Sequence, residues 1–175
     1  MSLRPRPAGA FVLEDRETWD DNASIVDAWR LPSIPLAELD LNRAGAVIRK
    51  PRSHAAFKGR KEVLDHFHAG FDWQGGDAGT SRWVPQGLTG SADSSDADVD
   101  GRRWLAVSWH NEHDDVEHGM RMSFADVTEW ATPIRYRHVL LVKPEPADDP
   151  SARAALSGIP AHAGGVVRFP NYCEQ

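Results

Sequence analysis

Apolar and polar positions along the second half of the chain follow patterns that are typical of β-strands. Four segments carry them: "WVPQGLTGSAD" at 83–93, "RRWLAVSWH" at 102–110, "GMRMSFADVT" at 119–128 and "IRYRHVLLV" at 134–142. The second segment is apolar at nearly every residue, which indicates a strand buried on both faces. Short polar connections, among them the favoured hairpin pair Asp100-Gly101, predict that the four strands form an antiparallel meander.

The fourth segment sits within "TPIRYRHVLLVKPEP" (132–146), where alternating residues lead into an apolar run and then a proline. Its first half carries Arg135 and Arg137 on one face, so we expect that half to be partly exposed. The run 139–142 is apolar on both faces, and we expect it to be covered on both. Pro144 has no N–H group to donate to a neighbouring strand, so the strand is predicted to end there.

Helical signals are confined to residues 14–70. They comprise a capped segment at 22–29, one or two turns within "PLAELDLNRAGAV" at 35–47, and the clearest helix, "KGRKEVLDHFHAGF" at 58–71. Gly70 stands at a position that favours a helix end. The next stretch, "FDWQGGDAGTSR" at 71–82, holds three glycines and two aspartates and predicts a loop.

These patterns predict a mainly β fold, an antiparallel four-stranded meander with short N-terminal helices. Residues 1–13 are expected to be disordered, residues 14–82 to mix helix and loop, and residues 83–175 to form the β region, in one domain with the preceding segment. An echo of the first strand in "PAHAGGVVRF" at 160–169 predicts a further strand there. Hydrophobic residues make up 41% of the 175 residues, which suffices for a buried core.

Composition argues against several classes of protein. The net charge of −6 argues against nonspecific nucleic-acid binding, which needs a basic surface. No apolar run approaches the roughly 20 residues of a membrane-spanning helix. Cys173 is the only cysteine, so no intramolecular disulfide can form. The apolar stretch 8–13 is shorter than the core of a signal peptide, and on this ground the sequence predicts a cytoplasmic protein.

Five motifs in order, "WVPQGLTGSAD", "VDGRRWLAVSWH", "GMRMSFADVT", "YRHVLLVKP" and "AHAGGVVRF", carry a resemblance. With "WDDNASIVDAWR" and "AVIRKPRSHAAFKG" before them, the chain resembles the N-terminal part of a family of bacterial secreted, β-propeller-like proteins of unknown function. The resemblance spans residues 18–172. It implies about one propeller blade plus the start of another, an apparently truncated chain and a secreted protein.

The resemblance also bears on function. A partial propeller cannot close, so exposed strand edges and self-association through them are expected. The chain carries no nucleophile elbow, phosphate-binding loop or dinucleotide fingerprint. We therefore expect a non-catalytic binding or structural module rather than an enzyme.

Asp96, Asp98 and Asp100, followed by Gly101, match the first half of an EF-hand calcium loop. Carboxylates on alternate residues can converge on one hard cation, so calcium is the candidate cofactor. The twelfth position of such a loop would be Val107 instead of a glutamate, and a strand follows in place of a helix. The alternative interpretation is a solvated acidic hairpin loop.

His110, His113 and His118 occur among acidic residues in "HNEHDDVEH" and form the alternative metal site. Imidazole and carboxylate groups together can hold zinc or another transition metal. On this basis the alternative function is a metal-dependent hydrolase that uses loop 110–118. The spacing is not H-E-x-x-H, so a plain polar connection between two strands is the competing interpretation. His162 is interpreted as a turn residue.

Overall fold

The computed structural model describes part of the chain, which divides into two compact units. One unit comprises Met1–Pro32 with Pro144–Ala155, and the other comprises Ser33–Lys143 with Leu156–Gln175. The described residues are 26–27, 29–30, 32–48, 59, 65–93, 98–112, 119–130, 133–145, 155–159, 161–162 and 164–166. In the first unit, the carbonyl groups of Val26 and Asp27 accept hydrogen bonds from the N–H groups of Trp29 and Arg30. Val26 and Asp27 are helical, within the segment expected at 22–29.

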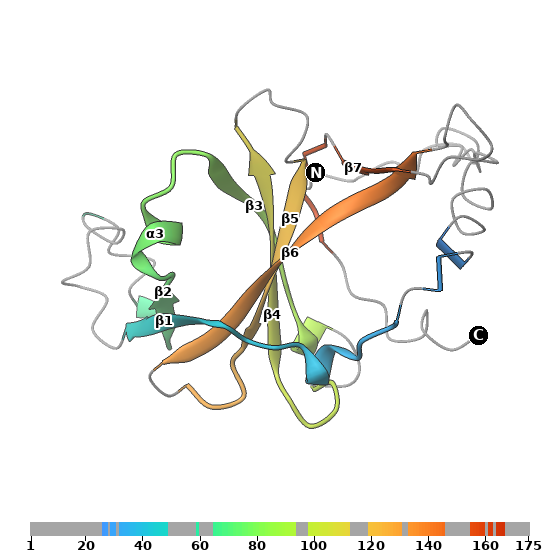
Figure 1. Cartoon of the computed structure of the whole chain (residues 1–175). Helices are drawn as coiled ribbons and strands as arrows, with labels where there is room; N and C mark the ends of the chain where they lie inside the picture. The colour runs from blue at the N-terminus through green and yellow to red at the C-terminus, as the bar shows by residue number, and fades with distance from the viewer. Residues whose placement is uncertain are drawn as a thin grey trace, which may run out of the picture. The chain divides into compact units, whose positions relative to one another are not determined.

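An antiparallel sheet dominates the second unit (Figure 1). Its strands are β1 (Arg43–Ile48), β2 (Gly70–Asp72), β3 (Trp83–Gly90), β4 (Trp104–Asn111), β5 (Met120–Asp126) and β6 (Ile134–Glu145). The strand order is β2-β1-β6-β5-β4-β3, and β7 (Ala155–Gly158) pairs with β6 off this path. The antiparallel pairing of β3 through β6 confirms the predicted four-stranded meander. The sheet is larger than predicted, because β1 and β2 extend it past β6.

The core lies mainly on one face of this sheet. A buried cluster of Ala125, Val127, Ile134 and Tyr136 packs against four partly buried side chains: Val47, Phe71, Trp73 and Leu105. Strand β4 is buried on both faces, as its continuous apolar pattern predicts, since Trp104 and Trp109 are both almost fully buried. The sequence pattern therefore locates the centre of the sheet correctly.

One N-terminal expectation is confirmed and another is wrong. The 3₁₀ turn η1 (Leu36–Glu38) confirms one helical turn within residues 35–47, and from Arg43 onward this stretch belongs to β1. A Cβ on Gly45 would lie 2.5 Å from the carbonyl oxygen of Asp72, so glycine permits the close approach of β1 and β2. Residues 71–82 are more than a loop, because they include part of β2 and the helical turn α3 (Gly75–Ala78).

The helix expected at 58–71 is wrong over its second half, because Asp65 is helical but residues 66–69 are neither helix nor strand, and Gly70 already belongs to β2. Residues 58 and 60–64 lie outside the described residues. Among residues 160–169, those described are 161–162 and 164–166, and they adopt no strand. No helix in the described segments is long and apolar enough to cross a membrane.

The first half of β6 is exposed on one face as expected, with Arg135 outward, but its second half is not covered on both faces, which contradicts the prediction. Ile134 and Tyr136 at its start are 1% and 0% exposed, whereas Leu140 and Val142 are 46% and 38% exposed. The reason is that β1 pairs with β6 only at its start, opposite Ile134 to Tyr136. Pro144 does not end the strand, which continues to Glu145. Its missing N–H group is tolerated because pairing with β5 has already stopped at Leu141.

Candidate functional site

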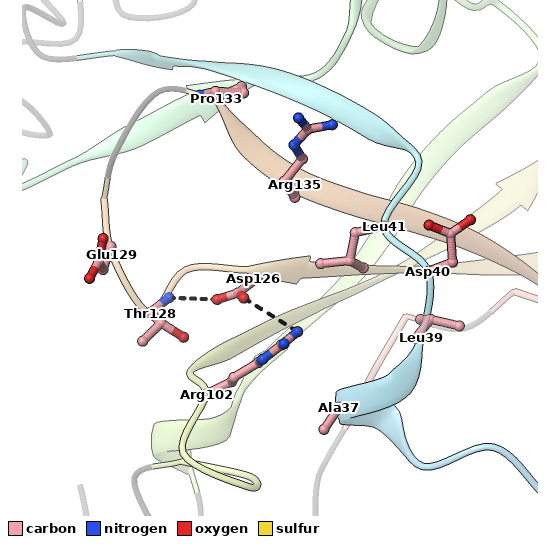
Figure 2. Close-up of a pocket in the computed structure, with 10 residues that line it drawn as sticks. All are labelled: Ala37, Leu39, Asp40, Leu41, Arg102, Asp126, Thr128, Glu129, Pro133 and Arg135. Carbon is pink, nitrogen blue, oxygen red and sulfur yellow. Dashed lines mark hydrogen bonds and ion pairs between the residues drawn. The ribbon is translucent and has the colours of Figure 1, made fainter.

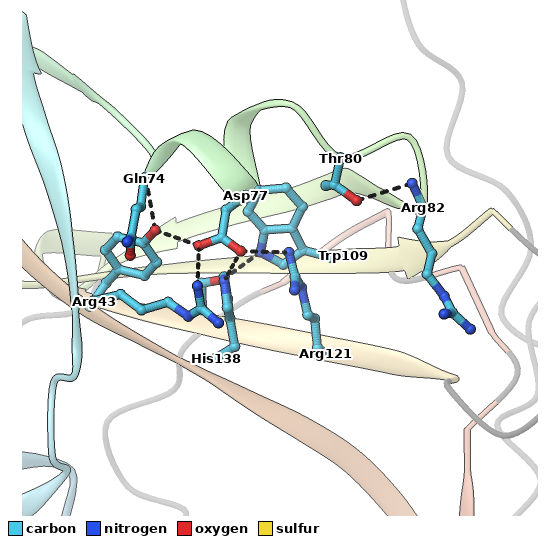
Figure 3. Close-up of polar contacts among 10 residues, drawn as sticks. Arg43, Gln74, Asp77, Thr80, Arg82, Trp109, Arg121 and His138 are labelled. Atoms are coloured by element: carbon cyan, nitrogen blue, oxygen red, sulfur yellow. Dashed lines mark hydrogen bonds and ion pairs between the residues drawn. The ribbon is translucent and has the colours of Figure 1, made fainter.

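A buried carboxylate, that of Asp77, joins polar side chains from three strands (Figure 3). Its Oδ2 accepts hydrogen bonds from the Tyr136 hydroxyl at 2.6 Å and from Arg43 Nη1 at 3.1 Å. Its Oδ1 lies 3.0 Å from His138 Nε2 and 4.0 Å from Arg121 Nη2. The contact with His138 is too bent to be a hydrogen bond. We call these five residues the Asp77 cluster.

Strand register explains why these partners share one face of the sheet. Arg43 of β1 is paired with Tyr136 of β6, and Ser123 of β5 is paired with His138 of β6. Side chains along a strand alternate between the two faces. Arg121 and Ser123 on β5 therefore point to the same face as Tyr136 and His138 on β6.

Polar contacts anchor the turn that carries Asp77. Asp77 is the buried residue of α3. The Tyr136 hydroxyl, which donates to Asp77, accepts a hydrogen bond from the backbone N–H of Gln74 at 2.9 Å. Gly75 and Gly76 are exposed, and a Cβ added to either would meet no atom within 4 Å. The turn thus rests on the sheet chiefly through Asp77 and the Gln74 backbone.

Burial and hydrogen bonding shift the pKa values within the Asp77 cluster. Burial raises the pKa of the Asp77 carboxyl, but the hydrogen bond from Tyr136, the close contact with His138 and the charge of Arg43 together outweigh this effect, and the pKa is lowered overall. Burial lowers the pKa of His138, and the charge of Arg121 lowers it further. Burial and the bond to Asp77 raise the pKa of Tyr136 to about 12. At neutral pH the cluster therefore combines an ionised carboxylate and two arginines with a neutral imidazole.

Arg121 has an unusual environment for a guanidinium group. Its side chain is 11% exposed, and its guanidinium carbon lies over two indole rings, 4.6 Å from the Trp83 centroid and 4.8 Å from that of Trp109. Both rings are within cation–π distance, which favours the charged guanidinium. Its Nε and Nη2 are buried and form no hydrogen bond within the described part of the chain. Burial lowers the pKa of Arg121 to about 10.

Ser123, His138 and Asp77 have the side-chain types of a hydrolase triad. The Ser123 Oγ lies 2.6 Å from His138 Nδ1, and Trp109 Nε1 donates a hydrogen bond to that Oγ. A nucleophile must reach its substrate, and Ser123 is 0% exposed. In this arrangement Ser123 donates to the neutral imidazole and fixes the ring beside Asp77. These contacts position side chains within the sheet.

A second site is open to solvent, at the end of the sheet where β5 ends and β6 begins (Figure 2). It is a cleft of about 640 Å³. Its lining residues come from the segment before β1, the β3–β4 connection, the end of β5, the β5–β6 connection and the start of β6: Ala37, Leu39, Asp40, Leu41, Arg102, Asp126, Thr128, Glu129, Pro133 and Arg135. We call it the Arg135 cleft.

Most charges in the Arg135 cleft are already engaged. Asp126 Oδ1 accepts a hydrogen bond from the N–H of Thr128 at 3.0 Å, and its Oδ2 lies 3.8 Å from Arg102 Nη1. Asp40 is held by Arg137, whose Nη1 lies 3.2 Å from Asp40 Oδ2. By contrast, the Arg135 and Glu129 side chains form no hydrogen bond or ion pair with the described residues. These two free charges can receive a ligand.

The aspartates predicted to bind calcium fall only partly within the described residues, since Asp96 lies outside them. Asp98 Oδ1 accepts a hydrogen bond from the N–H of Gly101 at 3.2 Å. Asp100 and Gly101 have positive φ angles of 52° and 74°, and Val99 bridges to Arg102 across the turn. The predicted Asp100-Gly101 hairpin turn is therefore present, and calcium binding stays a prediction.

Of the alternative metal ligands, His113 and His118 lie outside the described residues. His110 lies on β4, and its ring stacks on that of His162 with the centroids 3.7 Å apart. In the portion of the chain that the structure describes, no three His, Cys, Asp or Glu side chains gather closely enough to hold a metal ion. The metal site of loop 110–118 stays a prediction.

Sequence reasoning missed both the Asp77 cluster and the Arg135 cleft. Asp77 and Tyr136 are 59 positions apart, and only the fold brings them together. Two signals were available: an aspartate between glycines in "QGGDAG", and Arg121 between two methionines of an alternating strand. No protein-family model, curated protein or solved structure matches this chain.

Proposed function

We propose that the protein is a non-catalytic binding module that holds a small anionic ligand in the Arg135 cleft. The observation that carries this proposal is an arginine with no partner among the described residues, on the wall of a cavity of about 640 Å³. Ligand sites in proteins typically measure about 300–1,000 Å³. The size and the free charge together favour a small molecule over a macromolecular surface.

The lining indicates the chemistry of this ligand. Leu39, Leu41 and Pro133 supply an apolar wall, and Arg135 supplies a cation. A guanidinium group presents paired N–H donors that match the two oxygens of a carboxylate. The cleft thus suits a carboxylate joined to a short apolar body. Glu129 carries the other free charge and disfavours a second anionic group near it.

Binding is proposed instead of catalysis because of the side chains that line the cleft. The residues of the lining include no histidine, cysteine, serine or lysine. Those types supply most nucleophiles and most bases that work near neutral pH. Ser123 and His138 point to the opposite face of the sheet from Arg135, because residues of opposite parity along β6 face opposite ways.

Ligand-observed NMR with a panel of small carboxylates, including acetate, hexanoate and benzoate, tests this proposal. We expect hexanoate or benzoate to bind more tightly than acetate, because they add apolar contact. Arg135→Gln should weaken binding about tenfold or more, the typical loss of a charged hydrogen bond. Arg103→Gln is the matched control, since Arg103 is exposed and outside the lining. Equal binding by both variants would contradict the proposal.

We also propose that the protein is related to secreted β-propeller-like proteins. Strands β3 to β6 have the number and the antiparallel order of one propeller blade, which supports it. The whole sheet exceeds the four strands of a blade through β1 and β2. A binding or structural role is compatible with either architecture, because the Arg135 cleft is built by the strands of this sheet and the segments next to them.

A further inference from the structure

Every partner of the Asp77 carboxylate that the structure describes is a hydrogen-bond donor or a cation. Arg43 and Tyr136 approach Oδ2, and His138 and Arg121 approach Oδ1. Four donor groups that converge on two oxygens form the arrangement that proteins use to bind carboxylate and phosphate groups. Asp77 reaches this position from a separate segment, as a ligand would.

The charges around Asp77 are not balanced. Among the described residues, two arginines face one carboxylate, and the buried Nε and Nη2 groups of Arg121 have no hydrogen-bond partner. Buried donors are normally satisfied, and each that is not carries a cost in stability. These groups form the edge of the guanidinium that binds oxyanions with two parallel hydrogen bonds. A larger anion with two negative charges would satisfy the arginines better than Asp77 does.

The turn that carries Asp77 has features that would allow it to move away from the sheet. Gly75 and Gly76 are exposed, and a Cβ added to either would meet no atom within 4 Å, so close packing does not require glycine there. Glycine at such positions gives the backbone freedom to rearrange. Trp73, just before the turn, packs edge-on against Trp109 and Tyr136 and provides a fixed point.

We propose that Arg43, Arg121, Tyr136 and His138 form a binding site for a phosphate-sized dianion, which Asp77 occupies in this structure. The dianion displaces the Asp77 carboxylate, and the turn from Gln74 to Gly79 moves away to admit it. Asp77 is then a tethered competitor, which lowers the apparent affinity for the free anion. This site lies on the opposite face of β6 from Arg135, so it is independent of the Arg135 cleft.

A phosphate titration of the full chain tests this inference, with tryptophan fluorescence and amide hydrogen exchange as readouts. In the wild type we expect a saturable change in fluorescence, because Trp109 and Trp83 flank Arg121. Exchange of the amides from Gly75 to Gly79 should become faster when phosphate binds. The Arg121→Gln variant should lose both responses. Acetate, with one charge, should bind at least tenfold more weakly than phosphate.

The decisive variant is Asp77→Ala, which removes the competitor. We expect it to bind phosphate about tenfold or more tightly than the wild type, and its melting temperature to rise by about 5 °C in saturating phosphate. Asp93→Ala controls for general salt effects, because Asp93 is an exposed aspartate outside the Asp77 cluster, in the 3₁₀ turn η4 (Ser91–Asp93) that follows β3. If Asp77→Ala does not fold, the phosphate titration of the wild type and of Arg121→Gln tests the inference without it. A wild type without a saturable response, or one whose response survives in Arg121→Gln, overturns the inference.

Discussion

The Tyr136 hydroxyl donates a 2.6 Å hydrogen bond to Asp77 and accepts one from the backbone N–H of Gln74, so one side chain fixes both the carboxylate and its turn. Tyr136 is 0% exposed and belongs to the apolar core cluster of the sheet. The Asp77 cluster and the hydrophobic core therefore share a residue, and a substitution that disrupts one should also affect the other.

Replacing Tyr136 tests this coupling. Tyr136→Phe should lower the free energy of unfolding by about 1–3 kcal/mol, because Asp77 loses a donor and the Gln74 N–H loses its acceptor. Thr128→Val is the comparison, since Thr128 Oγ1 accepts one exposed hydrogen bond from the N–H of Arg103. Urea denaturation measures both variants. A smaller loss for Tyr136→Phe than for Thr128→Val would contradict the proposed anchoring role.

Stability should fall as the pH falls through two windows. The pKa of His138 is lowered from 6.5 in the fold, so below about pH 6.5 the unfolded chain takes up a proton that the folded chain resists. The pKa of Asp77 is lowered from 3.8, so its stabilising contribution is present above that value and is lost at lower pH. Denaturation between pH 3 and 8 tests both windows.

A histidine variant isolates the first of these windows. His138→Gln should reduce the slope of stability against pH between about pH 5 and 7, because one group that resists protonation is removed. His68→Gln, at an exposed position, should leave this slope in place. An unchanged slope in His138→Gln would show that His138 does not cause it.

Arg121→Met should change stability by no more than about 1 kcal/mol. The substitution loses two cation–π contacts of about 0.5–2 kcal/mol each, and it removes buried donors that cost a comparable amount. Trp109→Ala, by contrast, should cost about 3–5 kcal/mol because it empties a buried position. Thermal and urea unfolding compare the two. A loss of several kcal/mol in Arg121→Met would mean that the guanidinium is a structural support.

The isolated chain is expected to self-associate through the exposed end of β6. Leu140 and Val142 are 46% and 38% exposed. The outer strand β3 is a poorer edge for association, because Pro85 and the register shift after it interrupt its ladder. Leu140→Lys should reduce light scattering at high protein concentration, and Ile34→Lys, outside the sheet, should not. A monodisperse wild-type monomer at all concentrations would contradict this expectation.

The sequence patterns predict the local parts of the fold well. The β3–β6 meander and its Asp100-Gly101 turn follow from periodicity and turn chemistry, which act over a few residues. The pairing of β1 with β6 is a long-range contact, and β1 carries no clear alternation in "RAGAVI". For the same reason the sequence does not predict the exposure of the second half of β6, because the burial of that half depends on where β1 stops.

The candidate sites follow the same division between local and long-range information. Spacing motifs predict metal ligands such as Asp98, Asp100 and His110, which are close in sequence. The sites that the fold builds combine residues from distant segments, such as Arg43 with Asp77, or Leu41 with Arg135. No local spacing rule connects such residues, so only strand order and register bring them together.

Chemical-shift mapping on ¹⁵N-labelled protein, titrated with benzoate, tests the central claim of ligand binding in the Arg135 cleft most directly. We predict saturable shifts for backbone amides around Leu41, Thr128 and Arg135, and their loss in Arg135→Gln but not in Arg103→Gln. Shifts that are absent, or that map elsewhere on the sheet and persist in Arg135→Gln, would contradict the claim.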